Sequence, residues 1–246
     1  NVLEIYLDNA ATTRVCPEAA QAAMNAMLDD YGNPSSTHAK GRAALKLVMN
    51  ARKQLAKALG CEPWEIAFTS CGSESDNWAL WSGAEYVSRK GGHIISSTVE
   101  HDAIRRALDE LERRGYEVTR LTPGESGAVS VEQVQSALRP DTILVSLMLV
   151  NNETGAVTDV SAISKALKSV NPDALMHTDA VQGFLKVPFK AKTLGADLIS
   201  ISGHKIHAPK GIGALYIKSG VRLKPLIVGG AQEDGRRAGT ENVPYI

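Results

Sequence analysis

The sequence predicts an α/β protein with a mainly parallel seven-stranded sheet covered by helices on both faces. Two observations carry this prediction. Seven short runs rich in apolar and β-branched residues alternate with longer segments whose apolar residues recur every three or four positions. Most of the short runs are predominantly apolar and do not alternate strictly with polar residues, which is typical of parallel strands buried on both faces.

The elements follow in order along the chain. A first helix is expected at 17–28, where Pro17 stands at its start, and a second at 39–59, with apolar residues at Leu45, Val48, Leu55 and Leu59. Strands are expected at 66–69, 93–97, 117–121, 142–147, 175–178, 198–201 and 213–217. Further helices are expected at 73–89, 102–114, 131–138 and 160–169.

The chain shows no internal repeat, no low-complexity linker and no clear domain boundary. Its length is enough for one large domain with a substantial core. We therefore expect residues 1–246 to form a single large domain. The Gly and Pro clusters at 32–34 and 228–230 are interpreted as turns or functional loops.

Composition narrows the class of protein. The 27 basic and 27 acidic residues cancel without a long run of either sign, so no nucleic-acid or membrane partner is expected. No apolar stretch is long enough to span a bilayer, and the N-terminal residues do not resemble a signal peptide. The three widely spaced cysteines form no C-x-x-C pair, which argues against a disulfide framework and a metal site. We expect a cytoplasmic protein.

A lysine follows the predicted strand 198–201. Lys205 ends the sequence Ser202-Gly203-His204-Lys205, directly after that buried run. Most lysines lie on the surface, and a surface loop is one interpretation. The other is Schiff-base chemistry, because an amine in a partly desolvated pocket loses its proton readily and condenses with an aldehyde.

The turn after strand 66–69 opens a helix. Gly72 and Ser73 stand where free backbone N–H groups and the positive end of the helix dipole favour a phosphate. The alternative is that Ser73 is only an N-cap, with Glu74 or Asp76 complementing the dipole.

Two further strand ends carry polar side chains. His101 follows strand 93–97 and could stack on a flat ligand or move a proton, or it could merely cap the next helix. Asn151 and Asn152 could bind a polar ligand edge or form an ordinary Asx turn.

A carboxylate also stands at the end of a predicted strand. Asp179 ends the strand through His177 and Thr178, and Gln182 follows it. A buried carboxylate needs a partner, either a cationic ring nitrogen or a structural salt bridge. Ligands gather at the carboxyl ends of parallel strands. A phosphate turn, a stacking histidine, an acid and a lysine at those ends together fit pyridoxal phosphate.

The chain as a whole resembles the cysteine desulfurases, the NifS/IscS-type branch of the class V aminotransferase-like, fold-type-I pyridoxal phosphate enzymes. Eight ordered motifs carry the resemblance: YLDNAATT (6–13), GNPSSTH (32–38), TSCGSESDN (69–77), EH (100–101), NNETG (151–155), DAVQ (179–182), SGHK (202–205) and RAGT (237–240). The resemblance implies a three-layer large domain of the fold-type-I transferases that binds pyridoxal phosphate.

The resemblance also implies roles. Lys205 would hold the cofactor covalently and then move protons as a catalytic residue. Asp179 would keep the pyridine nitrogen protonated, and Gln182 would bond the phenolic oxygen. His101 would stack over the ring and act in acid–base steps. The phosphate would be held by Gly72, Ser73, Ser202 and His204.

Three more positions within the eight motifs match family positions with an implied role. Asn152 would contact both cofactor and substrate, and Asn33 would contact the amino-acid substrate. Thr240 would reach the phosphate of the other subunit, which implies a homodimer with shared active sites.

The implied reaction converts L-cysteine to L-alanine and leaves a persulfide on an enzyme cysteine, for delivery to an iron–sulfur scaffold or another acceptor protein. The alternatives are a selenocysteine lyase, another class V enzyme, and a catalytically silent scaffold subunit. The family often has Gly-Ala-Thr or Gly-Gly-Thr where this chain has Cys71-Gly72-Ser73, but Ser73 keeps the hydroxyl.

The resemblance also implies a second, smaller domain. The family continues into a small C-terminal domain with the persulfide-forming cysteine loop, and we expect that domain to be absent from residues 1–246. Cys16, Cys61 and Cys71 are expected to be structural thiols, since free cysteine is usually just buried.

Overall fold

Residues 5–246 are described by the computed structural model, which contains seven short strands in one sheet. The strands are β1 (Ile66–Thr69), β2 (His93–Ser97), β3 (Glu117–Leu121), β4 (Thr142–Ser146), β5 (Leu175–Asp179), β6 (Leu198–Ser202) and β7 (Gly213–Ile217). Their order in the sheet is β1-β7-β6-β5-β4-β2-β3. β7 is antiparallel to both neighbours, and the pairs among β6, β5, β4, β2 and β3 are parallel. The predicted α/β class and mainly parallel seven-stranded sheet are confirmed.

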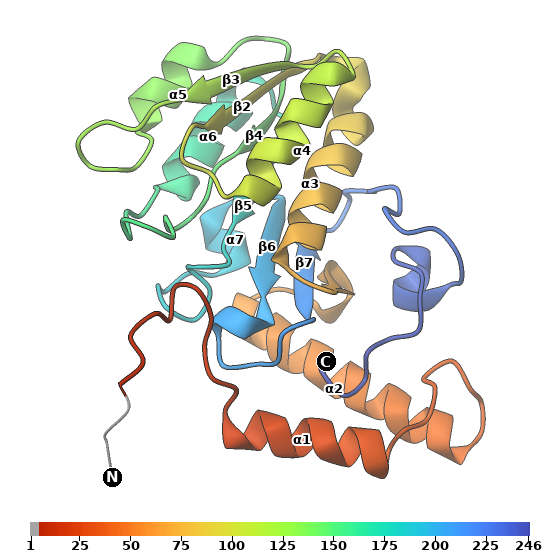
Figure 1. Ribbon diagram of the computed structural model, residues 1–246. Helices are drawn as coiled ribbons and strands as arrows, with labels where there is room; N and C mark the ends of the chain where they lie inside the picture. The colour runs from red at the N-terminus through yellow and green to blue at the C-terminus, as the bar shows by residue number, and fades with distance from the viewer. Residues whose placement is uncertain (1–4) are drawn as a thin grey trace.

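Helices cover both faces of this sheet (Figure 1). They are α1 (Pro17–Leu28), α2 (Ala39–Leu59), α3 (Gly72–Val87), α4 (Asp102–Arg113), α5 (Val131–Ala137), α6 (Val160–Val170) and α7 (Ala191–Leu194). Side chains of α3 and α4 form one apolar cluster with one face of the sheet. Side chains of α2, α5, α6 and α7 form a second cluster with the other face, which gives three layers.

The alternation of side chains along each strand divides the core between the two clusters. In β6, Leu198 packs with the α3 and α4 cluster, whereas Ile199 and Ile201 pack with the other cluster. All five residues of β6 are buried. A strand covered on both faces has no solvent-facing side, which explains why β6 consists of apolar residues and small serines without any charged residue.

Element boundaries differ from the sequence prediction by a few residues. The helix expected at 73–89 begins one residue earlier and gives way at Ser88 to a 3₁₀ turn, η2 (Ser88–Lys90). The strand expected at 142–147 ends at Ser146, while β5 and β6 each extend one residue further, to Asp179 and Ser202. The helices expected at 102–114 and 131–138 end one residue earlier, and that at 160–169 one residue later.

Several short elements escaped the sequence prediction altogether. They are α7, of four residues, and the 3₁₀ turns η1 (Pro63–Glu65), η3 (Gly203–Lys205) and η4 (Gln232–Gly235). Such turns are too short to show the helical period, so periodicity could not reveal them.

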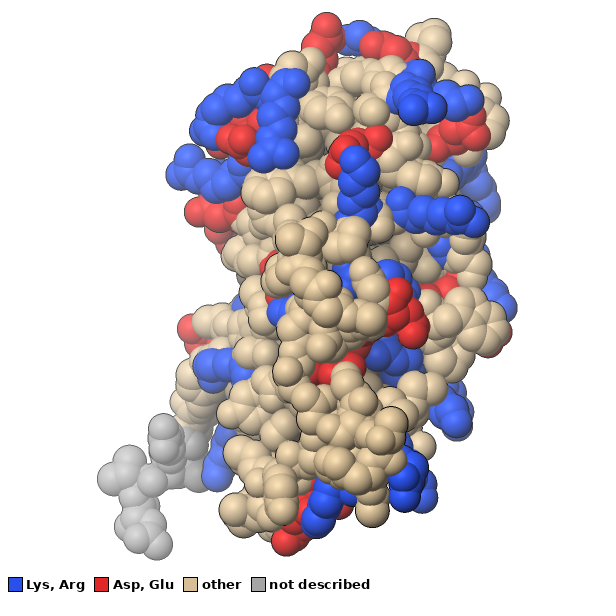
Figure 2. Space-filling model, turned by 90° about the vertical axis from the view of Figure 1, so that its right-hand side faces the viewer, with Lys and Arg blue, Asp and Glu red and all other residues tan. Residues whose placement is uncertain are grey.

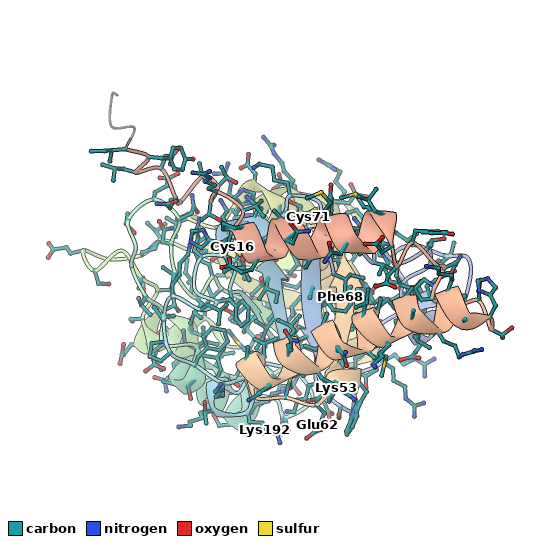
Figure 3. The ribbon with its side chains drawn as sticks, turned by 90° about the horizontal axis from the view of Figure 1, so that it is seen from below. Cys16, Lys53, Glu62, Phe68, Cys71 and Lys192 are labelled. Carbon is teal, nitrogen blue, oxygen red and sulfur yellow. The ribbon has the colours of Figure 1, made fainter. Side chains whose placement is uncertain are left out.

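α1 and α2 lie at the lower end of the molecule in Figure 1 and spread across it when seen from below in Figure 3. Ala26 of α1 belongs to the same buried cluster as Ala44 and Val48 of α2. Small residues at these positions allow the two helices to approach each other closely.

A buried ion pair anchors the segment 233–237 to α2 and β1. Arg52 donates to both carboxylate oxygens of Glu233, at 2.8 and 2.6 Å, and the Phe68 N–H donates to the same carboxylate at 3.0 Å. Breaking a buried pair of this kind typically costs about 3–5 kcal/mol, because it leaves an uncompensated charge. Arg237 donates to Glu74 at 2.8 and 3.1 Å and so ties the same segment to the start of α3.

None of the helices within residues 5–246 combines the length and the apolar character needed to cross a bilayer.

Candidate active site

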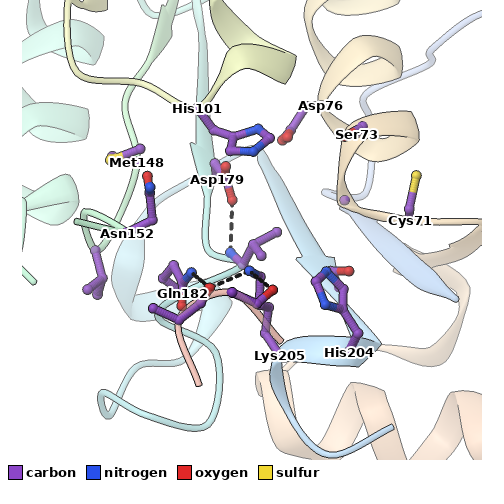
Figure 4. A pocket seen from close by; sticks show the side chains of 16 residues that line it. Cys71, Ser73, Asp76, His101, Met148, Asn152, Asp179, Gln182, His204 and Lys205 are labelled. Atoms are coloured by element: carbon purple, nitrogen blue, oxygen red, sulfur yellow. Dashed lines mark hydrogen bonds between the residues drawn. The ribbon is translucent and has the colours of Figure 1, made fainter. Parts of the chain in front are cut away.

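A pocket of about 430 Å³ lies beside the carboxyl ends of β4, β5 and β6 and the start of α3. This volume falls within the usual range of small-ligand sites. In Figure 4, His101 and Asp76 lie above the open space and Gln182, Lys205 and His204 below it. The pocket is lined by Ala10, Ala11, Cys71, Gly72, Ser73, Asp76, His101, Met148, Val150, Asn152, Asp179, Val181, Gln182, Ser202, His204 and Lys205.

Lys205 enters this pocket from η3, the 3₁₀ turn directly after β6. Its side chain is partly buried, and its ammonium donates to the carbonyl of Ala11 at 2.8 Å and to that of Ala10. Burial lowers the pKa of Lys205, and the positive charge of Lys186 lowers it further. The structure thus favours the nucleophilic amine over the surface-loop interpretation.

The turn before α3 presents unpaired donors to the same space. α3 begins at Gly72 with Cys71 as its N-cap residue and without a side-chain cap, so the N-cap interpretation of Ser73 is wrong. The first N–H groups of the helix have no intrahelical acceptor. The hydroxyl of Ser202 is buried, lines the pocket and has no hydrogen-bond partner among residues 5–246. These groups suit an anion.

Gly72 is needed at this turn for steric reasons. A Cβ atom at residue 72 would lie 2.8 Å from Cγ2 of Val181 and 3.4 Å from Cβ of Ser202. The helix start can therefore approach the loop after β5 and the end of β6 only because residue 72 lacks a side chain.

Asp179 stands at the end of β5 and is only 7% exposed. One carboxylate oxygen accepts the N–H of Val181 at 2.9 Å. The salt bridge weighed as an alternative is not found, since Asp179 forms no ion pair with any residue in the described range 5–246. Burial raises the pKa of this carboxyl, and the nearby His101 and Lys205 counteract the rise. A cationic group in the pocket would stabilise its ionised form.

His101 caps the next helix, which was one of the two interpretations, and it also lines the pocket. Its Nδ1 accepts the N–H of Ala103 at 3.1 Å, which caps α4. The same ring lines the pocket and lies next to Asp179 in Figure 4.

The two consecutive asparagines differ in their contacts. Oδ1 of Asn151 accepts the N–H groups of Glu153 and Thr154, each at 2.9 Å, so Asn151 forms the Asx turn. This turn leaves Asn152 lining the pocket.

Gln182 and His204 hold the N-terminal segment over the pocket. The amide of Gln182 donates to the carbonyl of Ala10 at 2.8 Å and accepts from Lys186 at 3.0 Å. Nδ1 of His204 lies 3.2 Å from the hydroxyl of Thr12. Residues from opposite ends of the chain thus close one wall of the site.

Two candidate residues lie apart from the pocket. Asn33 and Thr240 are both exposed and do not line it. Oδ1 of Asn33 instead accepts the N–H of Ser35 at 2.9 Å. Their implied roles toward substrate and a second subunit stay predictions.

Sequence reasoning missed two buried acids beside the site. Asp76, considered only as a charge for the helix dipole, is 2% exposed and lines the pocket. Glu100, 5% exposed, accepts from the Ser97 hydroxyl at 2.6 Å and from the Met148 N–H at 3.2 Å, and burial raises its pKa to about 8. An acid within an apolar helical pattern was the available signal for Asp76.

The described residues contain no group of three or more His, Cys, Asp or Glu side chains placed to hold a metal ion. The pocket itself offers an anion site at the start of α3, space beside the imidazole of His101, the buried carboxyl of Asp179 and the amine of Lys205, whose pKa is lowered. This combination is suited to a phosphorylated aromatic aldehyde.

Comparisons with known proteins agree with this geometry. A cysteine desulfurase from Trichormus azollae is 49% identical over 242 residues, which are 98% of this chain and 60% of that protein. A solved structure described as a NifS-like protein matches 99% of this chain and 67% of its own, with a TM-score of 0.96 and 40% identity. A second, described as SspA in complex with cysteine, covers 98% and 70%, with a TM-score of 0.93 and 39% identity.

This chain spans about 60% of the length of the curated relatives it matches. The family model for class-V aminotransferases matches residues 5–246. The match includes every residue that lines the pocket. Sequence, fold and pocket therefore lead to one conclusion: the chain belongs to the class-V aminotransferase family.

Proposed function

We propose that this chain is the cofactor-binding part of a pyridoxal phosphate-dependent cysteine desulfurase. The observation that carries the proposal is the convergence of Lys205, Asp179, His101 and the start of α3 on one pocket. The names of the similar proteins support the choice of cysteine as substrate.

The residues present fit pyridoxal phosphate. The buried, unpartnered hydroxyl of Ser202 and the free N–H groups of α3 would hold the phosphate, together with Gly72, Ser73 and His204. Asp179 is a buried carboxyl that forms no ion pair in the part of the chain that the structure describes, and a protonated ring nitrogen would provide one. When bound, pyridoxal phosphate supplies an aldehyde that condenses with amines and a ring that accepts electrons.

Individual side chains of the pocket would then have distinct roles. Lys205 would hold the cofactor through its amine and would be placed to move a proton at the substrate carbon. Asp179 would hold a proton at the ring nitrogen. His101 would cover the ring face, and Gln182 would donate to the phenolic oxygen. Asn152, on the opposite wall, would orient the substrate.

The proposed reaction balances without an added oxidant. The C–S bond of L-cysteine breaks, an S–S bond forms on an enzyme thiol, and the thiol proton replaces sulfur on the product carbon. L-cysteine and a thiol thus yield L-alanine and a persulfide.

None of the three thiols in this chain is suited to accept that sulfur. Cys61 is partly buried, and burial raises its pKa to about 12. Cys16 is the N-cap residue of α1 and Cys71 that of α3, so both thiols stand at fixed helix starts and not on a mobile loop. We therefore place the acceptor cysteine in a segment outside residues 1–246, and the later acceptor in a separate protein such as an iron–sulfur scaffold.

Alanine formation by the full-length protein tests the proposed function. We expect L-cysteine to yield equal amounts of L-alanine and of sulfide when a reducing thiol is added to release the persulfide. L-selenocysteine serves as the competing substrate. Turnover of selenocysteine alone, or release of neither product, would contradict the assignment.

We propose further that the protein is a homodimer that pairs through α1 and α2. Large apolar side chains are exposed there, among them Met24 and Leu28 on α1 at 45% and 68%, and Leu45 and Met49 on α2 at 44% and 41%. Figure 2 shows few charges on the lower part of one face, at the height of these helices. Exposed apolar patches commonly mark protein interfaces. The role that the resemblance implies for Thr240, which is exposed, requires a second copy of this kind.

Charged substitutions on α1 test this interface. The double variant Met24→Glu and Leu28→Glu, one turn apart on the same helix face, should weaken the dimer by roughly tenfold or more. Val170→Glu on α6, where Val170 is 46% exposed, is the matched control and should leave the dimer intact. Analytical ultracentrifugation of the full-length protein measures both. A monomeric wild type, or an unaffected double variant, would refute the proposed interface.

A further inference from the structure

Lys186 stands in the turn after β5, and none of the roles proposed above uses it. It follows Gln182 by four residues, and Gln182 lines the pocket. The ammonium of Lys186 donates to Oε1 of Gln182 at 3.0 Å. Lys186 itself is partly exposed and does not line the pocket, so any effect that it has on the site passes through Gln182 or through its charge.

A strained backbone conformation brings Lys186 back towards Gln182. Leu185, directly before it, has a φ of 60°, in the left-handed region that leucine rarely adopts. Its side chain is 64% exposed, so packing of the leucine does not explain this conformation. The turn is closed instead by the N–H groups of Lys186 and Val187, which donate to the carbonyl of Gly183 at 3.0 and 2.9 Å. Backbone strain of this kind clusters at functional sites.

The two partners of Gln182 fix the direction of its amide. An ammonium can only donate, so the atom that Lys186 contacts must be the carbonyl oxygen of the amide. On the other side, Nε2 donates to the carbonyl of Ala10 at 2.8 Å, and a carbonyl can only accept. Turning the amide over would place two donors against each other at Lys186 and two acceptors against each other at Ala10. The NH2 group therefore stays on the side of Ala10, which lines the pocket.

This NH2 group has a hydrogen left for a ligand. Within residues 5–246 it donates to Ala10, and an amide NH2 group can give two hydrogen bonds. The charged donor at Oε1 of Gln182 also polarises the amide, which strengthens the bond that its NH2 group gives. An oxygen that accepts such a bond is stabilised in its anionic form.

The charges near Lys205 come from several elements. Burial lowers the pKa of Lys205 and the positive charge of Lys186 lowers it further, while Asp179 at the end of β5 and Asp8 in the N-terminal segment raise it. Burial also lowers the pKa of His204, the residue before Lys205, and the charge of Lys205 adds to that effect. Lys186 is thus a positive charge close to the proposed position of the covalent bond.

We propose that Lys186 is a positioning residue that holds the NH2 group of Gln182 towards the phenolic oxygen of the cofactor and so favours the anionic form of that oxygen. This inference rests on the proposed function, because it requires pyridoxal phosphate in the pocket. It gives Lys186 no contact with cofactor or substrate. Loss of Lys186 should therefore change the ionisation of the bound cofactor and leave its bond to Lys205 intact.

A pH titration of the visible colour tests this role. The full-length protein is loaded with pyridoxal phosphate and dialysed, and its absorbance is followed against pH. Methionine keeps a long side chain but neither donates nor carries charge, so the phenolic oxygen and the nitrogen of Lys205 become easier to protonate in Lys186→Met. We expect the midpoint of the colour change to rise by roughly half a pH unit or more in this variant. Lys186→Arg keeps the charge and the donor, so its midpoint should return close to that of the wild type.

Two further variants provide matched controls. Lys190→Met removes a lysine of the same segment, whose ammonium donates to the carbonyl of Ala58 at 2.8 Å and not to Gln182. Leu185→Gly keeps both side chains of the contact, and glycine adopts a positive φ freely, so the turn should persist. Both variants should titrate as the wild type does.

The outcomes separate this inference from the proposed function. A wild type that binds no pyridoxal phosphate and stays colourless would refute the proposed function and the role of Lys186 with it. A coloured wild type whose midpoint is unchanged or lowered in Lys186→Met would overturn the role of Lys186 alone. The same holds if Lys186→Arg titrates like Lys186→Met, because the effect would then come from packing, or if Lys186→Met loses its colour on dialysis.

Discussion

Lys205→Ala should abolish the yellow colour that survives dialysis of the purified full-length protein, and with it the turnover of L-cysteine. The colour depends on a covalent bond between the cofactor and the lysine amine, which alanine cannot form. Loss of proton transfer alone should lower the rate by roughly 10²–10⁴-fold. Visible absorbance before and after dialysis, together with alanine yield, measures both effects.

A second lysine provides the matched control. Burial lowers the pKa of Lys186 as it does that of Lys205, but Lys186 contacts Gln182 and does not line the pocket. Lys186→Ala should keep the dialysis-resistant colour. Colour that disappears in Lys186→Ala and persists in Lys205→Ala would reverse the assignment of the covalent residue.

Asp179→Asn should bind the cofactor but lower alanine formation by roughly 10²–10³-fold. Asparagine keeps the size of the side chain and can still accept the Val181 N–H, so the loop after β5 should stay in place. It cannot balance a positive charge at the ring nitrogen, and the ring would then accept electrons poorly. Steady-state kinetics should show the loss mainly in kcat.

The bound cofactor's absorbance separates this effect from simple loss of binding. A coloured Asp179→Asn protein with low turnover would support the electronic role. An undiminished alanine yield would exclude Asp179 as the partner of the ring nitrogen.

The order of helices and strands could be predicted from the sequence because it depends on local patterns. Continuous apolar runs identified strands such as β6, and spacings of three and four identified α2. Short turns such as η3 and the four-residue α7 gave no such signal. Their conformation depends on contacts with distant parts of the chain.

The candidate site followed from a topological rule. In parallel sheets, residues just after neighbouring strands meet at one edge, so His101, Asn152, Asp179 and Lys205 could be predicted to converge without coordinates. The structure brings all four into one pocket. The rule does not apply to Asn33, which precedes α2 and lies in an exposed turn.

The amino-acid sequence by itself determined the α/β class, the seven strands and the residues that follow them, because these depend on neighbours along the chain. Only the tertiary structure decided that Ala10 and Ala11 close one wall of the pocket and that Asp76 faces Asp179. Those contacts join segments many residues apart, and they arise from how α3 and the N-terminal segment pack against the sheet. Whether a carboxyl keeps its proton depends on that packing, since burial and nearby charge set its pKa.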